Sequence, residues 1–185
     1  MGIEQPATYY DKIWQRWERP SVLDPRSVLY AKAAAWAMRW EAVIDLGCGP
    51  GVVPGILNSW EWQGRYLGID FSAVAIDKCN ARNLPERFLF AQASIVGSQH
   101  NYDRPTVMVE VLEHIQDDLG VLGNVATGTP VFVTVPNFDD AGHVRHFAKF
   151  DDVFSRYGSM IEIEYATTIK KGPTTRWYLI EGVKK

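Results

Sequence analysis

A short, largely apolar run that breaks into closely spaced glycines constrains this chain more than any other feature. Residues 43–46 read Val-Ile-Asp-Leu and are followed by Gly47, Gly49 and Gly51. Such a run is typical of a strand that is buried on both faces of a parallel sheet. Glycines after the strand let a ligand approach the backbone, and the next helix directs its N–H groups at that ligand. The segment therefore predicts a nucleotide-type binding loop.

Strand and helix patterns alternate along the rest of the chain. We expect strands at residues 42–46, 65–70, 87–92, 106–111 and 130–135, and helices at 52–60, 73–82, 116–125 and 149–157. This order favours right-handed crossovers and a doubly wound α/β sheet. Residues 93–102 are turn-rich and predict a loop. Residues 159–168 and 174–183 flank a Lys-Gly-Pro turn and predict an antiparallel hairpin that closes the sheet.

Two amphipathic helices are expected before the first strand, at residues 7–18, where Pro20 ends the pattern, and at 28–40, where Asp24 is the expected N-cap. With 185 residues, 46% hydrophobic and 22% charged, the chain fits one domain: a helical cap over residues 1–40 and a Rossmann-like core over 41–185. We find no signal peptide and no membrane span, and the two cysteines form no metal pattern. A reducing, cytoplasmic location is expected.

The glycine loop is compatible with two cofactors. No Lys-Ser/Thr pair follows it, which argues against an ATPase phosphate loop. Asp70, at the end of the second predicted strand, is placed to accept hydrogen bonds from two ribose hydroxyls. From the residues alone, NAD and S-adenosylmethionine both remain possible.

Residues 45–51, Asp-Leu-Gly-Cys-Gly-Pro-Gly, and residues 66–72, Tyr-Leu-Gly-Ile-Asp-Phe-Ser, resemble the class I S-adenosylmethionine-dependent methyltransferases. The resemblance extends through residues 109–115 and 135–137. It implies a mostly parallel seven-stranded sheet of order 3-2-1-4-5-7-6 with an antiparallel last strand, and S-adenosylmethionine as cofactor with S-adenosylhomocysteine as product. The cofactor-binding residues that we assign on this basis are Asp45, Gly47, Cys48, Gly49, Gly51, Asp70, Phe71, Ser94 and Glu110.

Within that set the resemblance implies separate roles. Asp45 and the glycine backbone would hold the methionine moiety, Asp70 the ribose, and Phe71 the adenine face. The family usually has an acidic residue after the third strand to bind the adenine amino group. Here Ser94 or a backbone carbonyl would have to replace it.

A second group of residues falls where the acceptor of the methyl group is expected. Glu110, Glu113 and His114 would share one face of a helical turn, and His143 and His146 follow in a later loop. His114 or His143 could be a general base. Alternatively, the glutamates and histidines could bind a divalent metal, a pattern similar to that of the small-RNA terminal 2′-O-methyltransferases, or they could simply organise the loop. We assign His114, Glu110 and His143 as catalytic and no residue as a metal ligand.

The predicted activity is methyl transfer to an oxygen or nitrogen atom, with a small molecule as acceptor. The acceptor would enter between the N-terminal helices and loop 137–147, with Tyr10 and Trp14 as possible lid residues and Trp36 and Trp40 in the core. A nucleic-acid methyltransferase is the alternative, using a cationic patch formed by Arg145, His146, Lys149, Lys170, Lys171 and Arg176. A cofactor-binding protein without catalysis is a further possibility. The protein would be a monomer or a homodimer.

Overall fold

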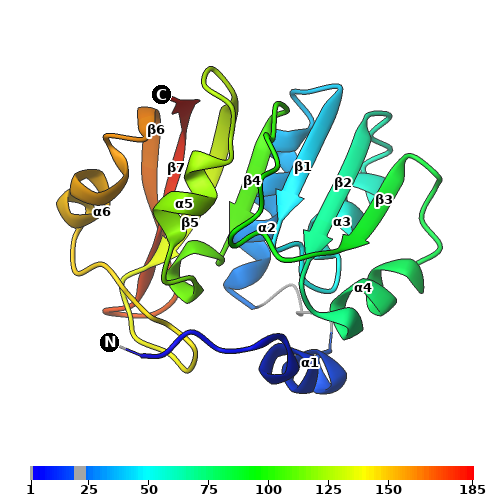
Figure 1. Cartoon of the computed structure of the whole chain (residues 1–185), viewed down its shortest axis with the longest axis horizontal. Coiled ribbons are helices and arrows are strands. Elements are labelled where there is room, and N and C mark those ends of the chain that lie inside the picture. Colours follow the sequence, from blue (N-terminus) through cyan, green and yellow to red (C-terminus); the bar gives the residue numbers. More distant parts are fainter. Residues whose placement is uncertain (1, 19–23) are drawn as a thin grey trace.

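Seven strands form one sheet of order β3-β2-β1-β4-β5-β7-β6 in the computed structural model, which describes residues 2–18 and 24–185 (Figure 1). The pairs among β1 to β5 are parallel, and β7 runs antiparallel to both of its neighbours. The predicted strand order and the antiparallel last strand are confirmed. The strands are β1 (Ala42–Leu46), β2 (Arg65–Asp70), β3 (Phe88–Gln92), β4 (Thr106–Val109), β5 (Pro130–Pro136), β6 (Ile161–Lys170) and β7 (Arg176–Lys184).

Helices cover both faces of the sheet because its central strands are apolar on both sides. Leu29, Ala33 and Trp36 of α2 pack with Val43 in one apolar cluster, whereas Leu122 of α5 belongs to the cluster on the other face. Trp36 is buried, as predicted, and Trp40 is half-buried. The helices are α1 (Ala7–Arg16), α2 (Arg26–Ala37), α3 (Val52–Ser59), α4 (Ala73–Asn80), the 3-10 helix η1 (Leu112–His114), α5 (Asp118–Gly123) and α6 (Phe150–Tyr157).

Helix α1 lies below the carboxyl ends of the parallel strands in Figure 1 and packs on α4. Ser72 caps α4, since its Oγ accepts a hydrogen bond from the backbone N–H of Ala75. The same Oγ donates to the Asp11 carboxylate at 2.5 Å, which ties α1 to the start of α4. This contact holds the first helix over the binding loop.

Most predicted helix and strand ends differ from the observed ones by one to three residues, and two of the differences have a clear local cause. Strand β4 ends at Val109 instead of residue 111, because Glu110 has a φ of 57°, in the left-handed region, where a strand cannot continue. Pro25, not Asp24, occupies the N-cap position of α2, and the Asp24 carboxylate accepts a hydrogen bond from the Arg26 backbone N–H at 2.9 Å. Pro20 lies outside the described residues. Over residues 2–18 and 24–185, no helix is both long and apolar enough to cross a bilayer.

Candidate active site

A cavity of about 730 Å³ opens at the carboxyl ends of the central strands. Its wall is assembled from the glycine loop, the end of β2, the segment after β4, helix α1 and the turn between β6 and β7. Of the residues assigned from the sequence, the wall includes Gly47, Cys48, Gly49, Asp70, Phe71, Ser94, Glu110, His114 and His143. Asp45 and Gly51 lie behind this wall.

The glycine loop is fixed to β2 through its own backbone. The N–H groups of Gly47 and Cys48 both donate to the carbonyl of Ile69, at 2.8 and 3.1 Å. Gly47, Gly49 and Gly51 have φ values of 75°, 52° and 74°, which residues with a side chain rarely adopt. A Cβ atom on Gly47 would also lie 2.5 Å from a methyl group of Val111. The loop therefore needs glycine for its conformation and for its close packing.

Asp70 presents a carboxylate to the cavity from a rigid position. Its Oδ2 accepts the Gly49 N–H at 2.9 Å, and its Oδ1 accepts the Ser72 N–H at 2.9 Å. Burial raises the pKa of Asp70, and these backbone donors oppose the rise. Each oxygen keeps a lone pair for a second donor. The geometry suits the two adjacent hydroxyls of a ribose.

Asp45 has a different position from the one its predicted role suggests. It is 2% exposed, does not line the cavity, and accepts a hydrogen bond from the Tyr66 hydroxyl of β2. Burial raises its pKa from 3.8 to about 7, although the Tyr66 hydroxyl favours the charged form. In this structure the Asp45 side chain links β1 to β2 through Tyr66, two residues before the glycine loop.

Aromatic and small residues line the part of the cavity beside Asp70. Phe71 and Ser94 line the cavity, and the Tyr10 ring of α1 lies 5.3 Å from the Phe71 ring, centroid to centroid. The Ser94 hydroxyl donates to the Val96 carbonyl at 3.2 Å and accepts the Val96 N–H at 3.1 Å. Trp14 lies across Gly49, so both predicted lid residues face the cavity.

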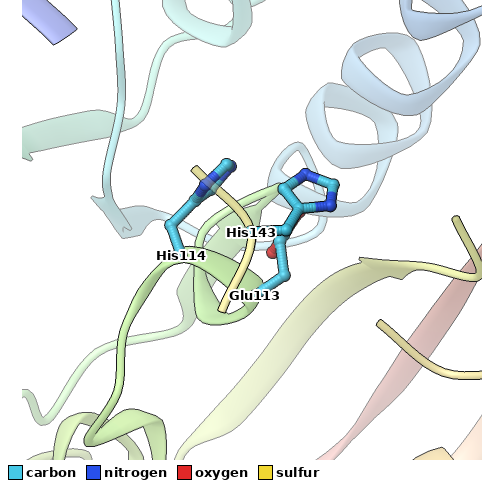
Figure 2. A group of neighbouring side chains, drawn as sticks. All are labelled: Glu113, His114 and His143. Atoms are coloured by element: carbon cyan, nitrogen blue, oxygen red, sulfur yellow. The ribbon is translucent and has the colours of Figure 1, made fainter. Parts of the chain in front are cut away.

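Glu113, His114 and His143 form one cluster, with ligating atoms that all lie within 4.8 Å of one another (Figure 2). Glu113 and His114 come from η1, and His143 comes from the loop after β5. Glu110 is not part of this cluster. Because of its positive φ, it accepts hydrogen bonds from the Trp177 indole N–H and, at 3.4 Å, from the Thr134 hydroxyl.

Both imidazoles have a defined tautomer. His114 Nδ1 lies 3.0 Å from the Gly142 carbonyl oxygen, and His143 Nδ1 lies 3.2 Å from the Phe138 carbonyl oxygen. A carbonyl only accepts, so each Nδ1 carries the proton and each Nε2 keeps a free lone pair. Burial lowers the pKa of His114 to about 4 and also lowers that of His143. Both rings are therefore neutral at pH 7.

Glu113 is fully buried, and neither of its carboxylate oxygens accepts a hydrogen bond from any described residue; its one side-chain hydrogen-bond partner there is the Glu110 carboxylate, to which a protonated Glu113 donates. Burial, followed by the charge of Glu110, raises its pKa well above the usual value. A buried carboxylate without a donor is unfavourable unless it binds a proton or a cation. The two free Nε2 atoms beside it make a cation a chemically sensible partner.

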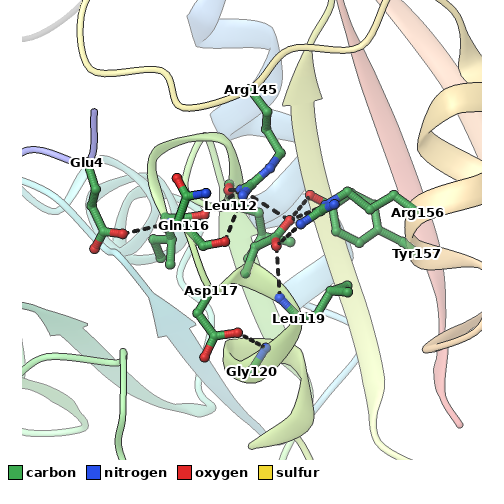
Figure 3. A network of polar contacts seen from close by, with 11 residues as sticks. Glu4, Leu112, Gln116, Asp117, Leu119, Gly120, Arg145, Arg156 and Tyr157 are labelled. Atoms are coloured by element: carbon green, nitrogen blue, oxygen red, sulfur yellow. Dashed lines mark hydrogen bonds and ion pairs between the residues drawn. The ribbon is translucent and has the colours of Figure 1, made fainter. Parts of the chain in front are cut away.

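Arg145 holds the two segments of this cluster together (Figure 3). Its guanidinium donates to the carbonyl oxygens of Leu112 and Ile115, and to that of Gln116 at 2.9 Å. Nearby, the Val144 N–H donates to the Glu113 carbonyl at 2.8 Å. The loop that carries His143 is thereby bound to the turn that carries His114.

The charge of Arg145 is balanced inside the protein by Asp118. Asp118 is fully buried and lies 3.2 Å from Arg145, and it also accepts hydrogen bonds from Arg156 and from the Tyr157 hydroxyl, the latter at 2.7 Å. The sequence predicts Arg145 as a member of a cationic surface patch. Its side chain is only 12% exposed and is bound internally, so the patch loses this member.

Other residues of the site have no simple signal in the sequence. Tyr30 of α2, Phe138 after β5 and Trp177 of β7 line the cavity and come from distant parts of the chain. Asn137 follows β5 directly, and its amide donates to the Thr174 carbonyl at 3.0 Å. A polar residue at the end of a strand is the one local feature that could have indicated its role.

Neither a family model nor a curated protein matches the sequence. Solved structures match along nearly its whole length. A magnesium protoporphyrin IX methyltransferase from Synechocystis with bound S-adenosylmethionine is 14% identical, with a TM-score of 0.71 over 97% of this chain and 95% of that one. The N-methyltransferase NodS from Bradyrhizobium japonicum, with S-adenosylhomocysteine, is 15% identical, with a TM-score of 0.74 over 96% of this chain and 98% of that one. The chain has the class I methyltransferase fold.

This methyltransferase fold supports more than one reaction. The cyclase SpnF also matches, with 14% identity and a TM-score of 0.69 over 96% of this chain and 94% of that one. Sequence identities at this level establish the fold alone. The activity of the chain has to be inferred from its own cavity.

Proposed function

We propose that the protein transfers a methyl group from S-adenosylmethionine to an oxygen or nitrogen atom of a small-molecule acceptor. The observation that supports this most directly is the Asp70 carboxylate, held by the Gly49 and Ser72 N–H groups on the cavity wall. It offers a fixed acceptor pair for ribose hydroxyls beside a backbone that has no side chains in the way.

The dimensions and residue types of the cavity fit this cofactor. A volume of about 730 Å³ lies in the range of sites that enclose a drug-sized ligand, and leaves room for an acceptor. Phe71 and Tyr10 supply aromatic surface for the adenine ring. When bound, S-adenosylmethionine would supply an electrophilic methyl group, and S-adenosylhomocysteine would be the product.

The protein would contribute placement and a base. Methyl transfer needs the attacking atom in line with the methyl group, which binding in one enclosed cavity provides. His114 and His143 are neutral and keep free Nε2 lone pairs, so either can take the proton that the acceptor atom loses. Glu110, on the same wall, is a further candidate for contact with the acceptor or the cofactor.

Calorimetric titration with S-adenosylmethionine tests the proposal. We expect binding by the wild type, and at least tenfold weaker binding by Asp70→Asn, because an amide cannot accept all four hydrogen bonds. Asp77→Asn on the exposed side of α4 is the matched control and should bind like the wild type. An unmeasurable affinity of the wild type, or equal affinities for all three proteins, would contradict the proposal.

A metal-assisted version of the reaction is a second candidate, supported by the buried Glu113 carboxylate that lacks a donor. Glu113, His114 and His143 would hold a divalent cation such as Mg²⁺ or Mn²⁺. Such an ion lowers the pKa of a bound hydroxyl group and orients it. The Nδ1 hydrogen bonds to backbone carbonyls are of the kind that orient metal-binding imidazoles.

The protein is first stripped of bound metal with EDTA, which is then removed, and is titrated with Mn²⁺ while binding is followed by electron paramagnetic resonance. This experiment tests the candidate without any turnover. His143→Ala should remove binding that the wild type shows. His146→Ala is the matched control, because His146 is exposed and lies outside the cluster. Equal Mn²⁺ binding by the two variants, or none by the wild type, would leave general-base catalysis as the explanation of the cluster. A nucleic-acid acceptor has less support, since Arg145 is bound internally.

A further inference from the structure

One part of the cavity is walled by aromatic rings from three separate elements. Tyr30, Phe138 and Trp177 line it, and the Phe138 and Trp177 rings meet edge to face with centroids 5.7 Å apart. Aromatic walls of this kind accommodate flat, apolar ligands. The residues that face the acceptor are therefore suited to a planar molecule.

Lys171 lies over these rings and lines the same cavity. Its Nζ is 3.8 Å from the centroid of the Phe138 ring and 5.5 Å from that of the Trp177 ring. Within residues 2–18 and 24–185, no ion pair includes its ammonium group. Contacts with ring faces leave N–H donors of the ammonium available for an anion.

The backbone around Lys171 is fixed, and its exposed side chain extends from there over the Phe138 and Trp177 rings. The Lys171 N–H donates to the Thr175 carbonyl at 2.9 Å within the hairpin turn. Asn137 holds this turn from the other side, donating to the Thr174 carbonyl and accepting the Arg176 N–H at 2.7 Å. The loop after β5 and the hairpin therefore present Lys171 to the cavity together.

The acidic residues nearby do not use up this charge. Asp24 is engaged by Arg26, with Nη2 2.6 Å from Oδ2. Glu110 is already engaged, because it accepts hydrogen bonds from the Trp177 indole N–H and the Thr134 hydroxyl. Asp140, the third acid on this part of the wall, is exposed to water. An anion bound here would find Lys171 as its direct partner.

We propose that the acceptor is a planar aromatic molecule with an anionic substituent, and that Lys171 binds that substituent. This inference rests on the proposed methyl transfer and names the class of acceptor. The group can be a carboxylate, a sulfonate or a phosphate, since each pairs with an ammonium group. The aromatic body would lie against Phe138 and Trp177.

Two dyes with the same ring system test the charge requirement. Anilinonaphthalene sulfonate is an aromatic anion, and phenylnaphthylamine is its counterpart without the sulfonate; both are followed by fluorescence. Lys171→Met keeps the apolar stem and removes the charge, so the anionic dye should bind about tenfold more weakly and the neutral dye equally well. Lys170→Met, on the exposed adjacent residue of β6, should bind both dyes like the wild type.

Equal affinities of Lys171→Met and wild type for the anionic dye would overturn the inference, as would an equal loss for both dyes. The dye measurements need neither S-adenosylmethionine nor turnover. Failure of the calorimetric titration would thus refute the proposed methyl transfer, whereas failure of the dye comparison would refute the role of Lys171.

Discussion

Replacing Arg145 by methionine should destabilise the protein more than any change to an exposed ion pair. The Arg145 side chain is 12% exposed, and its partner Asp118 is fully buried. Breaking a buried pair costs about 3–5 kcal/mol, and the three carbonyl groups that Arg145 binds would lose their donor as well. Because Arg156 still pairs with Asp118, we expect a loss near 3 kcal/mol, or about 6–12 °C in Tm for a chain of this size.

Urea and thermal unfolding, followed by circular dichroism, measure this loss. Arg39→Met is the matched control, because Arg39 is 55% exposed in its ion pair with Glu181 and should cost below about 1 kcal/mol. Arg145→Met should also lower the rate of methyl transfer by a larger factor than it lowers the affinity for S-adenosylmethionine, because the Arg145 side chain holds the loop that carries His143. Equal stabilities of the Arg145 and Arg39 variants would refute the assignment of Arg145 as the link between the two segments.

Two further predictions concern the glycine loop and the strand that leads to it. Burial raises the pKa of Asp45 to about 7, so between pH 4 and 7 the folded state holds a proton that the unfolded chain has released. The free energy of unfolding should therefore fall as the pH rises across this range, by at most about 4 kcal/mol. Asp45→Asn should make this fall smaller, which urea unfolding at pH 5 and at pH 8 measures. Gly47→Ala, whose Cβ would lie 2.5 Å from Val111, should weaken S-adenosylmethionine binding at least tenfold in calorimetry. Gly128→Ala, with φ of 84° but open space around it, should cost only about 1 kcal/mol of stability and leave the affinity unchanged.

The parts of the fold that could be predicted are those in which local sequence and burial agree. Strands β1 and β2 have the predicted ends, because each is an apolar run bounded by glycine or by a charged residue. The segment after β4 could not be predicted in this way. Val-Glu-Val-Leu reads as strand, and nothing in it indicates that Glu110 adopts a positive φ. As a result, Glu113 and His114 lie in one cluster, while Glu110 binds Trp177 instead.

Two other residues show why side-chain roles are harder to predict than strands. Asp45 shares its face of β1 with Val43, so its carboxylate points toward the buried layer between the sheet and α2. There it accepts a hydrogen bond from the Tyr66 hydroxyl of the neighbouring strand. Arg145 is followed by His146 in a polar stretch that suggests a solvated surface. Its burial depends on Asp118, 27 positions earlier in the chain, and no local pattern records that contact.

The two halves of the cavity are built in different ways, and this has a consequence for specificity. The half that we propose for the cofactor uses the glycine-loop backbone, the Asp70 carboxylate and Phe71, all within two short motifs that the sequence makes visible, together with Tyr10 and Trp14 of α1. The acceptor half uses side chains from α2, η1, the loop after β5 and β7, held together by Asn137 and Arg145. The Asn137 contacts join the loop after β5 to the hairpin turn and include no residue of the glycine loop. Substitutions at Phe138, Lys171 or Trp177 can therefore change which acceptor binds while the cofactor half keeps its geometry, and measuring S-adenosylmethionine affinity alongside dye affinity in each variant would separate the two halves.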